Sequence, residues 1–144
     1  MLVNNKFNNI KIHTQYSICE GAIKIDELAE YCKAKKIRCL GLADNYNLCG
    51  ALEFSEKLSK AGTQPIIGTQ INLKEHNTIG KITLYAKTEH GYKNLTKLSS
   101  LSYLKSNETE EPACSLADLI KNSKDLILLT GSYRDFFGKL LHSN

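Results

Sequence analysis

An amphipathic helix pattern that runs directly into an apolar strand pattern constrains the fold of this chain more than any other feature. Between residues 24 and 36, apolar side chains recur on one helical face, at Ile25, Leu28, Ala29 and Cys32. The sequence IRCLGLAD follows at once, and its continuous apolar core indicates a strand that is covered on both faces. A strand of that kind needs a layer on each side of its sheet, so we expect an α/β protein.

The alternation continues along the rest of the chain. The pattern predicts strands at 7–13, 39–44, 65–73, 82–87 and 125–131, and helices at 24–36, 50–61, 89–104, 115–120 and 134–141. The strands at 65–73 and 82–87 are expected to form a hairpin, and Ser115 with Asp118 predicts a capping box. The polar stretch KSNETEEPAC, residues 105–114, predicts a mobile loop. This order of elements favours a largely parallel sheet.

Size and composition exclude several classes of protein. With 144 residues, 42% of them hydrophobic, the chain suits one globular domain. A net charge of +4 permits contact with nucleic acid but does not require it. The N-terminal residues lack the apolar region of a signal peptide, and no apolar run reaches the length of a membrane span. We therefore expect a cytoplasmic protein with no membrane partner.

The cysteines, the remaining histidines and one basic cluster each have an ordinary explanation. Five cysteines without a CxxC pair argue against both a disulfide scaffold and a zinc ribbon, and we expect buried, reduced thiols. Cys49 follows a polar loop, but no histidine is predicted beside it to activate a nucleophile. His76, His90 and His142 are expected on the surface. The group Lys33, Lys35, Lys36 and Arg38 is interpreted as a solvated C-terminal helix end, with a phosphate-contact patch as the alternative.

Polar side chains follow three of the predicted strands, where α/β sheets place their ligand sites. They are His13 and Thr14, then Asp44 and Asn45, then Thr69 and Gln70. Metal-assisted hydrolysis needs several imidazoles and carboxylates around zinc or manganese, and these positions supply one of each. The ammonium of Lys11, two residues before His13, would repel a metal ion. A hydrogen-bonded polar cluster is therefore favoured over a working metal site.

A longer pattern carries a family resemblance. The stretch from IHTQYSICEGAIKIDELAEYC to PIIGTQINL resembles the N-terminal PHP (polymerase and histidinol phosphatase) domain of bacterial DNA polymerase III alpha subunits. That family runs as H-x-H-[ST]-x-[YF]-S-x-x-[DE]-G, then an Asp-His pair, then N-x-x-G-x-x-x-F, then KPIIG-x-E. The segments YAKTEHGYKNLTKLSSLSYL and LILLTG are also similar to the family. The positions kept here are His13, Thr14, Tyr16, Ser17, Glu20, Gly21, Asp44, Asn47, Gly50, Phe54 and 65–68.

The departures from the family pattern fall on its metal ligands. Lys11 stands for the first histidine, Asn45 for the histidine after the aspartate, and Gln70 for the glutamate, so only His13 and Asp44 remain. The resemblance then implies a degenerate site that holds no metal and has no catalytic residue, with zinc or manganese as cofactors only in the alternative case. We expect the Lys11 amine to take the metal position and pair with Asp44, with Asn45 and Gln70 completing the hydrogen bonds.

The resemblance also implies an architecture and a biological role. Residues 1–144 would be the N-terminal portion of a PHP-type distorted (β/α)7 barrel, either truncated or encoded by a split gene, and an open barrel predicts self-association or marginal stability. The parent protein would synthesise DNA in chromosomal replication. This portion would support the polymerase core and dock the proofreading exonuclease subunit, contacting DNA only through the parent. The alternatives are an active phosphoesterase or 3′–5′ exonuclease, and a free-standing interaction module.

Overall fold

A computed structural model describes residues 7–106 and 111–142. The helices are α1 (Ile25–Lys35), α2 (Ala51–Lys60), α3 (Glu89–Leu104), α4 (Leu116–Lys121) and α5 (Phe136–His142). The strands are β1 (Cys39–Asn45), β2 (Gln64–Glu75), β3 (Thr78–Ala86), β4 (Ala113–Ser115) and β5 (Leu126–Leu129). The predicted helices are therefore confirmed, and each observed helix end lies within two residues of the predicted one. The agreement is close because each helix combines a continuous apolar face with a clear boundary signal. None of the described helices is long and apolar enough to cross a membrane.

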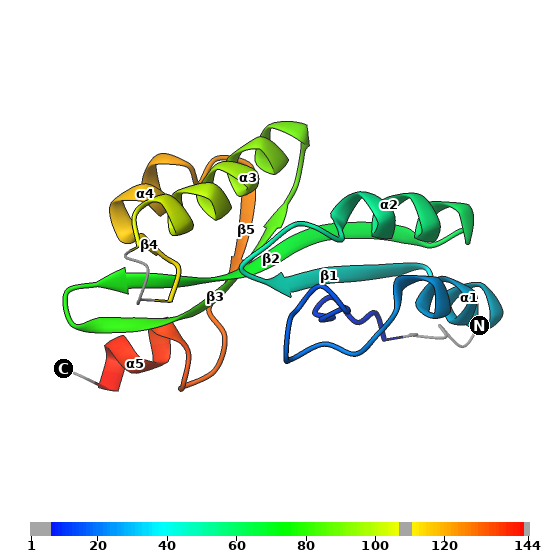
Figure 1. The fold of residues 1–144 in the computed structure, drawn as a ribbon, viewed down its shortest axis with the longest axis horizontal. Coiled ribbons are helices and arrows are strands. Elements are labelled where there is room, and N and C mark those ends of the chain that lie inside the picture. The colour runs from blue at the N-terminus through cyan, green and yellow to red at the C-terminus, as the bar shows by residue number, and fades with distance from the viewer. Residues whose placement is uncertain (1–6, 107–110, 143–144) are drawn as a thin grey trace, which may run out of the picture.

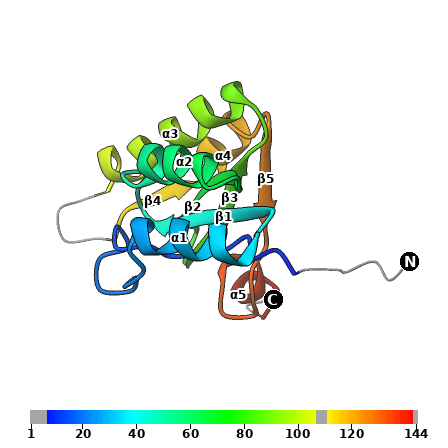
Figure 2. The same ribbon diagram turned by 90° about the vertical axis from the view of Figure 1, so that its right-hand side faces the viewer.

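The described strands form one mixed sheet in the order β1-β2-β3-β5, with β4 alongside the second half of β2. β1 and β4 run parallel to β2, whereas the β2–β3 and β3–β5 pairings are antiparallel. Helices α2, α3 and α4 lie on one side of the sheet and α5 on the other, while α1 lies beside β1 (Figures 1 and 2). The α/β class is confirmed. The expectation of a largely parallel sheet is wrong, because the predicted hairpin reverses the chain in its middle.

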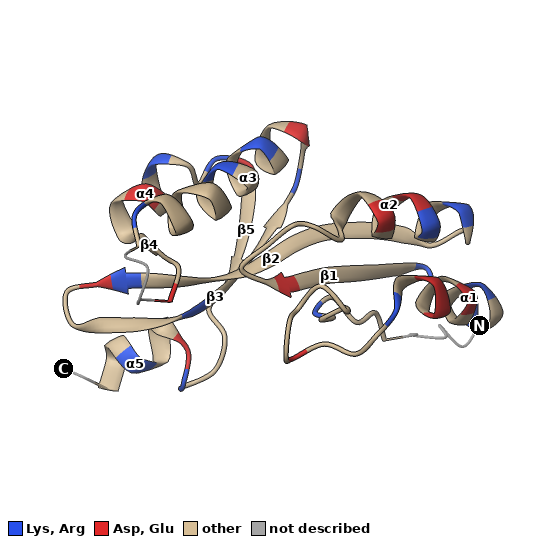
Figure 3. Ribbon diagram, in the orientation of Figure 1, with Lys and Arg blue, Asp and Glu red and all other residues tan. Residues whose placement is uncertain are grey.

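The core has two parts, which share the partly buried side chain of Leu48. The first joins α1, β1 and α2 around the fully buried Phe54. The second lies between the β2–β3 hairpin and α3, α4 and α5, where Phe136 is 1% exposed. Basic and acidic residues are interspersed on α1, α2 and α3 (Figure 3), as expected for solvated helix faces.

The predicted first strand at 7–13 is the clearest difference from expectation. Its backbone runs parallel to β1 and forms hydrogen bonds with it, including Ala43 N–H to the Ile12 carbonyl at 2.9 Å. These hydrogen bonds do not form a continuous ladder, and the segment makes one isolated β-bridge with β1, between Ile12 and Leu42. The alternation is only partly realised, because Ile12 is 8% exposed and Ile10 is 40% exposed. The segment is thus an extended strap along β1, at the edge of the sheet.

Three smaller predictions also needed the tertiary structure. The stretch 105–114 was predicted to be a mobile loop, but β4 begins within it at Ala113, because β2 continues far enough to pair with it. Residues 107–110 of that stretch lie outside the described residues. β5 is less buried than its apolar sequence suggested, with Ile127 48% exposed. Finally, Thr69 and Gln70 lie in the middle of β2 and not at its end, since β2 runs on into the hairpin.

Candidate functional site

Asp44, near the end of β1, is the centre of a buried hydrogen-bond cluster. Its carboxylate is fully buried and accepts hydrogen bonds from the Thr14 backbone N–H at 2.6 Å, the Thr14 hydroxyl at 2.7 Å and the Ser17 hydroxyl at 2.7 Å. The turn from Thr14 to Gly21 folds tightly over it, because a Cβ at Gly21 would lie 1.9 Å from the Thr14 carbonyl oxygen. All of its partners come from the chain itself, so this carboxylate is a structural anchor for the turn.

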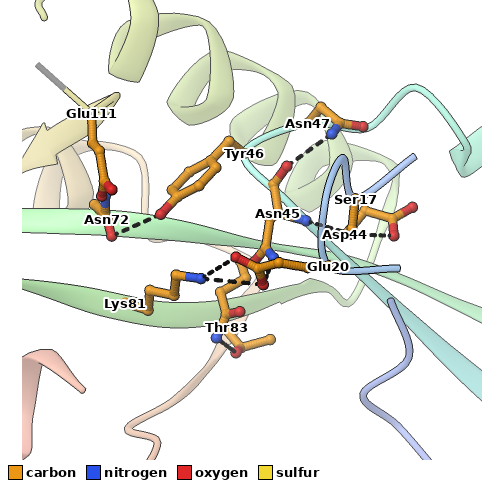
Figure 4. Close-up of polar contacts among 11 residues, drawn as sticks. Ser17, Glu20, Asp44, Asn45, Tyr46, Asn47, Asn72, Lys81, Thr83 and Glu111 are labelled. Atoms are coloured by element: carbon orange, nitrogen blue, oxygen red, sulfur yellow. Dashed lines mark hydrogen bonds and ion pairs between the residues drawn. The ribbon is translucent and has the colours of Figure 1, made fainter. Parts of the chain in front are cut away.

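A second cluster lies beside the first and links the same turn to β3. Figure 4 shows Glu20 between Asn45 and Lys81. The Asn45 side-chain amide donates to the Glu20 carboxylate, and the Lys81 ammonium lies 3.0 Å from the other carboxylate oxygen. The ammonium also lies 5.6 Å from the centre of the Tyr46 ring, a cation–π contact. Hydrogen bonding to Lys81 is the main reason why the pKa of Glu20 is lowered.

The sheet register brings the remaining amides to the same place. Asn45 pairs with Gln70 across β1 and β2, and Gln70 pairs with Thr83 across β2 and β3. The Gln70 side chain is 4% exposed, and its amide lies 3.5 Å from the Thr83 hydroxyl, at the limit of a hydrogen bond. One step further along β2, Asn72 accepts from the Tyr46 hydroxyl at 3.3 Å. A row of uncharged polar groups therefore crosses three strands.

Two buried polar atoms of the described residues have no hydrogen-bond partner: Nδ1 of His13 and the side-chain oxygen of Asn45. The pKa of His13 is lowered, first by burial and then by the positive charge of Lys11. A neutral imidazole nitrogen can accept a hydrogen bond or bind a metal ion, and an amide oxygen can accept a hydrogen bond or act as a weaker metal ligand. The clusters described above leave both atoms without a partner.

Lys11 does not occupy the predicted place. Its side chain is exposed, and its backbone N–H donates a hydrogen bond to the Asn9 side chain at 3.0 Å. The predicted ion pair with Asp44 is wrong, because the Asp44 carboxylate turns away from the strap and into the Thr14–Ser17 turn. The cation that the structure brings to the cluster is Lys81. The sequence contained one indication of this contact. Lys81 is two residues from Thr83 in the predicted hairpin, so both side chains lie on the same face of the sheet.

The described residues do not fit the metal centre that the family pattern implies. Over 7–106 and 111–142, no group of three or more histidine, cysteine, aspartate or glutamate side chains converges in a way that could hold a metal ion. The Asp44 oxygens are taken by three donors, and the Glu20 oxygens face an ammonium and an amide. An ammonium at that point raises the free energy of a divalent cation placed beside it.

The other residues singled out in the sequence lie apart from these clusters. Cys49 is exposed and donates its backbone N–H to the Asn47 side chain at 3.1 Å. His76 is exposed in the hairpin turn, and His90 lies 3.1 Å from Asp125 at the start of α3. His142 is exposed at the end of α5, and the basic group of α1 lies at the exposed C-terminal end of that helix. The three histidines and the basic group match the surface role expected for them. The expectation of buried thiols is confirmed for Cys32 and Cys114 and is wrong for Cys19 and Cys49, which are exposed.

Replacing Lys81 by Met is expected to raise the pKa of Glu20. The pKa is lowered in the folded protein, so the pair stabilises the fold above the unfolded pKa of Glu20, and this contribution is lost as the pH falls through the folded pKa. In Lys81→Met the acid dependence of stability at this position should therefore be weaker. NMR titration of the Glu20 side-chain carboxyl measures the shift directly. Lys93→Met, which breaks the exposed pair with Glu89, is the control, and an unchanged Glu20 titration in Lys81→Met would contradict the assignment.

Comparison with known proteins places these features in a family. The chain is 39% identical over 133 residues to the DNA polymerase III subunit alpha of Caulobacter vibrioides, which covers 87% of this chain and 12% of that protein. The alpha subunit of Vibrio cholerae is 33% identical over 139 residues, 94% of this chain and 12% of its own length. The chain thus spans about an eighth of these relatives, and the homology is to their N-terminal region.

Solved structures support the same fold. A protein described as a metal-dependent phosphoesterase, from Bifidobacterium adolescentis, superposes with a TM-score of 0.52 at 15% identity, over 67% of this chain and 33% of that one. An amidohydrolase from Chromobacterium violaceum gives a TM-score of 0.53 at 16% identity, over the same shares. Such likenesses are consistent with a partial distorted barrel. The sequence profile of the PHP domain matches residues 9–144, and the chain therefore belongs to the PHP domain family.

Proposed function

We propose that this chain is a metal-free, structural PHP domain portion of a replicative DNA polymerase III alpha subunit. The observation that carries the proposal is the state of the two acidic residues at the site. Asp44 is saturated by donors from Thr14 and Ser17, and Glu20 is held by Lys81 and Asn45. Hydrogen bonds thus stabilise the Asp44 carboxylate and an ammonium faces Glu20, which lowers the electrostatic need for a metal ion at these acids.

The relatives support a wider role. They are DNA polymerase III alpha subunits, and this chain aligns with about an eighth of their length. In this role the chain supports the polymerase core in the cytoplasm and docks the proofreading exonuclease subunit, while DNA synthesis itself belongs to the parent protein. The vestigial metal positions are Lys11, His13, Asp44, Asn45 and Gln70. A direct test is co-elution of the purified chain with the proofreading exonuclease of its host on size exclusion, and separate elution would contradict the docking role.

One observation favours the alternative of an active metal-dependent phosphoesterase or exonuclease. The partnerless atoms of His13 and Asn45 are what an absent ligand would leave behind. Both acids would then have to give up their present partners to complete a metal site. The cost of doing so, with an ammonium 3.0 Å from Glu20, makes this the second candidate.

Metal titration separates the two functions. We expect no saturable heat when zinc or manganese is added to the purified chain in a calorimeter, and no nuclease or phosphatase activity with either metal added. One equivalent of bound metal, lost in His13→Ala and retained in His76→Ala, would overturn the structural role. His76 is the matched control because it is an exposed histidine in the hairpin turn, far from the clusters in sequence. Without that control, weak binding to any surface imidazole could be mistaken for a site.

A further inference from the structure

A small basic hollow lies between the β2–β3 hairpin and the turn that precedes α5, next to the clusters described above. Its volume is about 240 Å³, and its charged lining consists of Lys81, Arg134, Lys139, Glu111 and Asp135. Three cations and two carboxylates thus line it, and the Lys81 ammonium is also paired with Glu20 at 3.0 Å. Figure 3 shows basic residues on β3 and on α5, which pack against each other on that side of the sheet. The hollow is shared by segments far apart in sequence, so its composition is a product of the fold.

The close approach of α5 to β3 depends on Gly80. A Cβ at this position would lie 2.5 Å from the backbone nitrogen of Phe136. Because glycine lets the two backbones meet, the turn carrying Arg134 and the first turn of α5 are held over Lys81. The wall of the hollow is therefore a fixed packing contact, and not a chance arrangement of long side chains.

The two outer cations each contact an uncharged group. The Lys139 ammonium donates to the Ile79 carbonyl at 2.8 Å. The Arg134 Nε donates to the Tyr133 hydroxyl at 2.7 Å, and the guanidinium lies 5.2 Å from the centre of the Tyr133 ring. Among the described residues Arg134 forms no ion pair. Its two terminal nitrogens keep their hydrogens for another acceptor, and that fork matches two oxygens of one oxyanion.

The two acids are each bound to a neighbour. Glu111 accepts from the Asn72 side chain at 3.0 Å. Asp135 accepts from the Ser132 backbone N–H at 2.6 Å and from the Ser132 hydroxyl at 3.0 Å, which closes the turn before α5. Those contacts reduce the tendency of either carboxylate to neutralise Arg134.

We propose that this hollow binds a phosphate group, with Arg134 and Lys139 as its main contacts and Lys81 as a supporting charge. The phosphate can belong to a free phosphate or nucleotide, or to the backbone of a nucleic acid strand. The volume exceeds what one phosphate group needs, and the exposed ring of Tyr133 beside Arg134 offers a surface on which a base can stack. The site does not depend on whether a metal binds at His13 and Asp44.

NMR titration of the ¹⁵N-labelled chain tests the site with two probes, inorganic phosphate and a single-stranded oligonucleotide. We expect saturable amide shifts at 79–81 and 132–139 with either probe, and sulfate should compete with phosphate. Arg134→Gln should weaken binding by about 10-fold or more, the size of effect expected when a charge-assisted hydrogen-bonded pair is lost. Tighter binding of the oligonucleotide than of phosphate would identify the nucleic acid backbone as the source.

Arg38→Gln is the matched control, because Arg38 is exposed and belongs to the basic group that follows α1. It should leave the titration unchanged. Shifts that do not saturate, or that respond equally to Arg134→Gln and Arg38→Gln, would mean ion screening only and would overturn the proposal. Loss of oligonucleotide binding in Arg38→Gln alone would place the nucleic acid contact at the end of α1 and would overturn it too. Lys139→Gln provides a second variant, so an unfolded Arg134→Gln protein does not prevent the test.

Discussion

Asp44→Ala is expected to lower the free energy of unfolding by about 3–5 kcal/mol, among the largest effects of any single substitution here. The substitution removes the acceptor for the Thr14 N–H, the Thr14 hydroxyl and the Ser17 hydroxyl, all within 2.7 Å of the carboxylate. Each donor is buried, so water cannot replace the lost partner without opening the turn. Urea unfolding followed by circular dichroism gives the value.

Two companion variants show what kind of interaction is lost. Asp44→Asn should be less damaging, since the Thr14 hydroxyl can rotate and accept a hydrogen bond from the new amide. Asp26→Ala removes a carboxylate whose side chain is 76% exposed, and it should leave stability close to that of the wild type. If Asp44→Ala were no worse than Asp26→Ala, Asp44 would not be the anchor of the turn. A metal-dependent site would then regain support, because its aspartate would be free to bind.

Gly41→Ala is expected to cost about 2–3 kcal/mol, because the added methyl group would overpack the contact between the strap and β1. A Cβ at Gly41 would lie 1.9 Å from the Ile10 carbonyl oxygen and 2.5 Å from the Ile10 carbonyl carbon. Both are backbone atoms, so a side-chain rotation cannot relieve the clash. The segment carrying His13 should be pushed away from β1, and hydrogen exchange at the Ala43 amide, which bonds the Ile12 carbonyl, should become faster.

Gly62→Ala is the control for the general effect of replacing a glycine. No atom lies within 4 Å of a Cβ built at Gly62, but its φ is +79°, so alanine should cost about 1 kcal/mol through backbone strain alone. Exchange at the Ala43 amide should not change in this variant. Unchanged Ala43 exchange in Gly41→Ala would show that the strap is not held by its close approach to β1.

Under the proposed structural role, hydrogen bonds and an ion pair hold the site together. The turn from Thr14 to Glu20 is fastened to β1 through Asp44 and to β3 through Lys81. Both fastenings use groups from different parts of the chain, so they form only when the sheet has assembled. In that role, the contacts of Asp44 and Lys81 with the turn do what a bound metal does in a metal-dependent site: they hold the loops at the strand ends in one arrangement.

The sequence by itself determined the local elements and the residue types at the predicted site. Continuous apolar stripes fixed the faces of α1 and α2, and turn and cap residues fixed most helix boundaries, because these signals act within a few residues. The departures of Lys11, Asn45 and Gln70 from the family pattern were also visible, since that pattern is a pattern of residue types.

Only the tertiary structure decided which charges meet. Lys81 reaches Glu20 across 61 residues, and that contact depends on the register of β2 with β3 and on the path of the Thr14–Glu20 turn. Lys11 is adjacent to the predicted site in sequence, but its side chain is exposed. The segment that carries it forms one isolated bridge with β1 and not a regular strand of the sheet. Side-chain direction at a sheet edge follows from backbone pairing, and pairing is a long-range property that residue types alone do not encode.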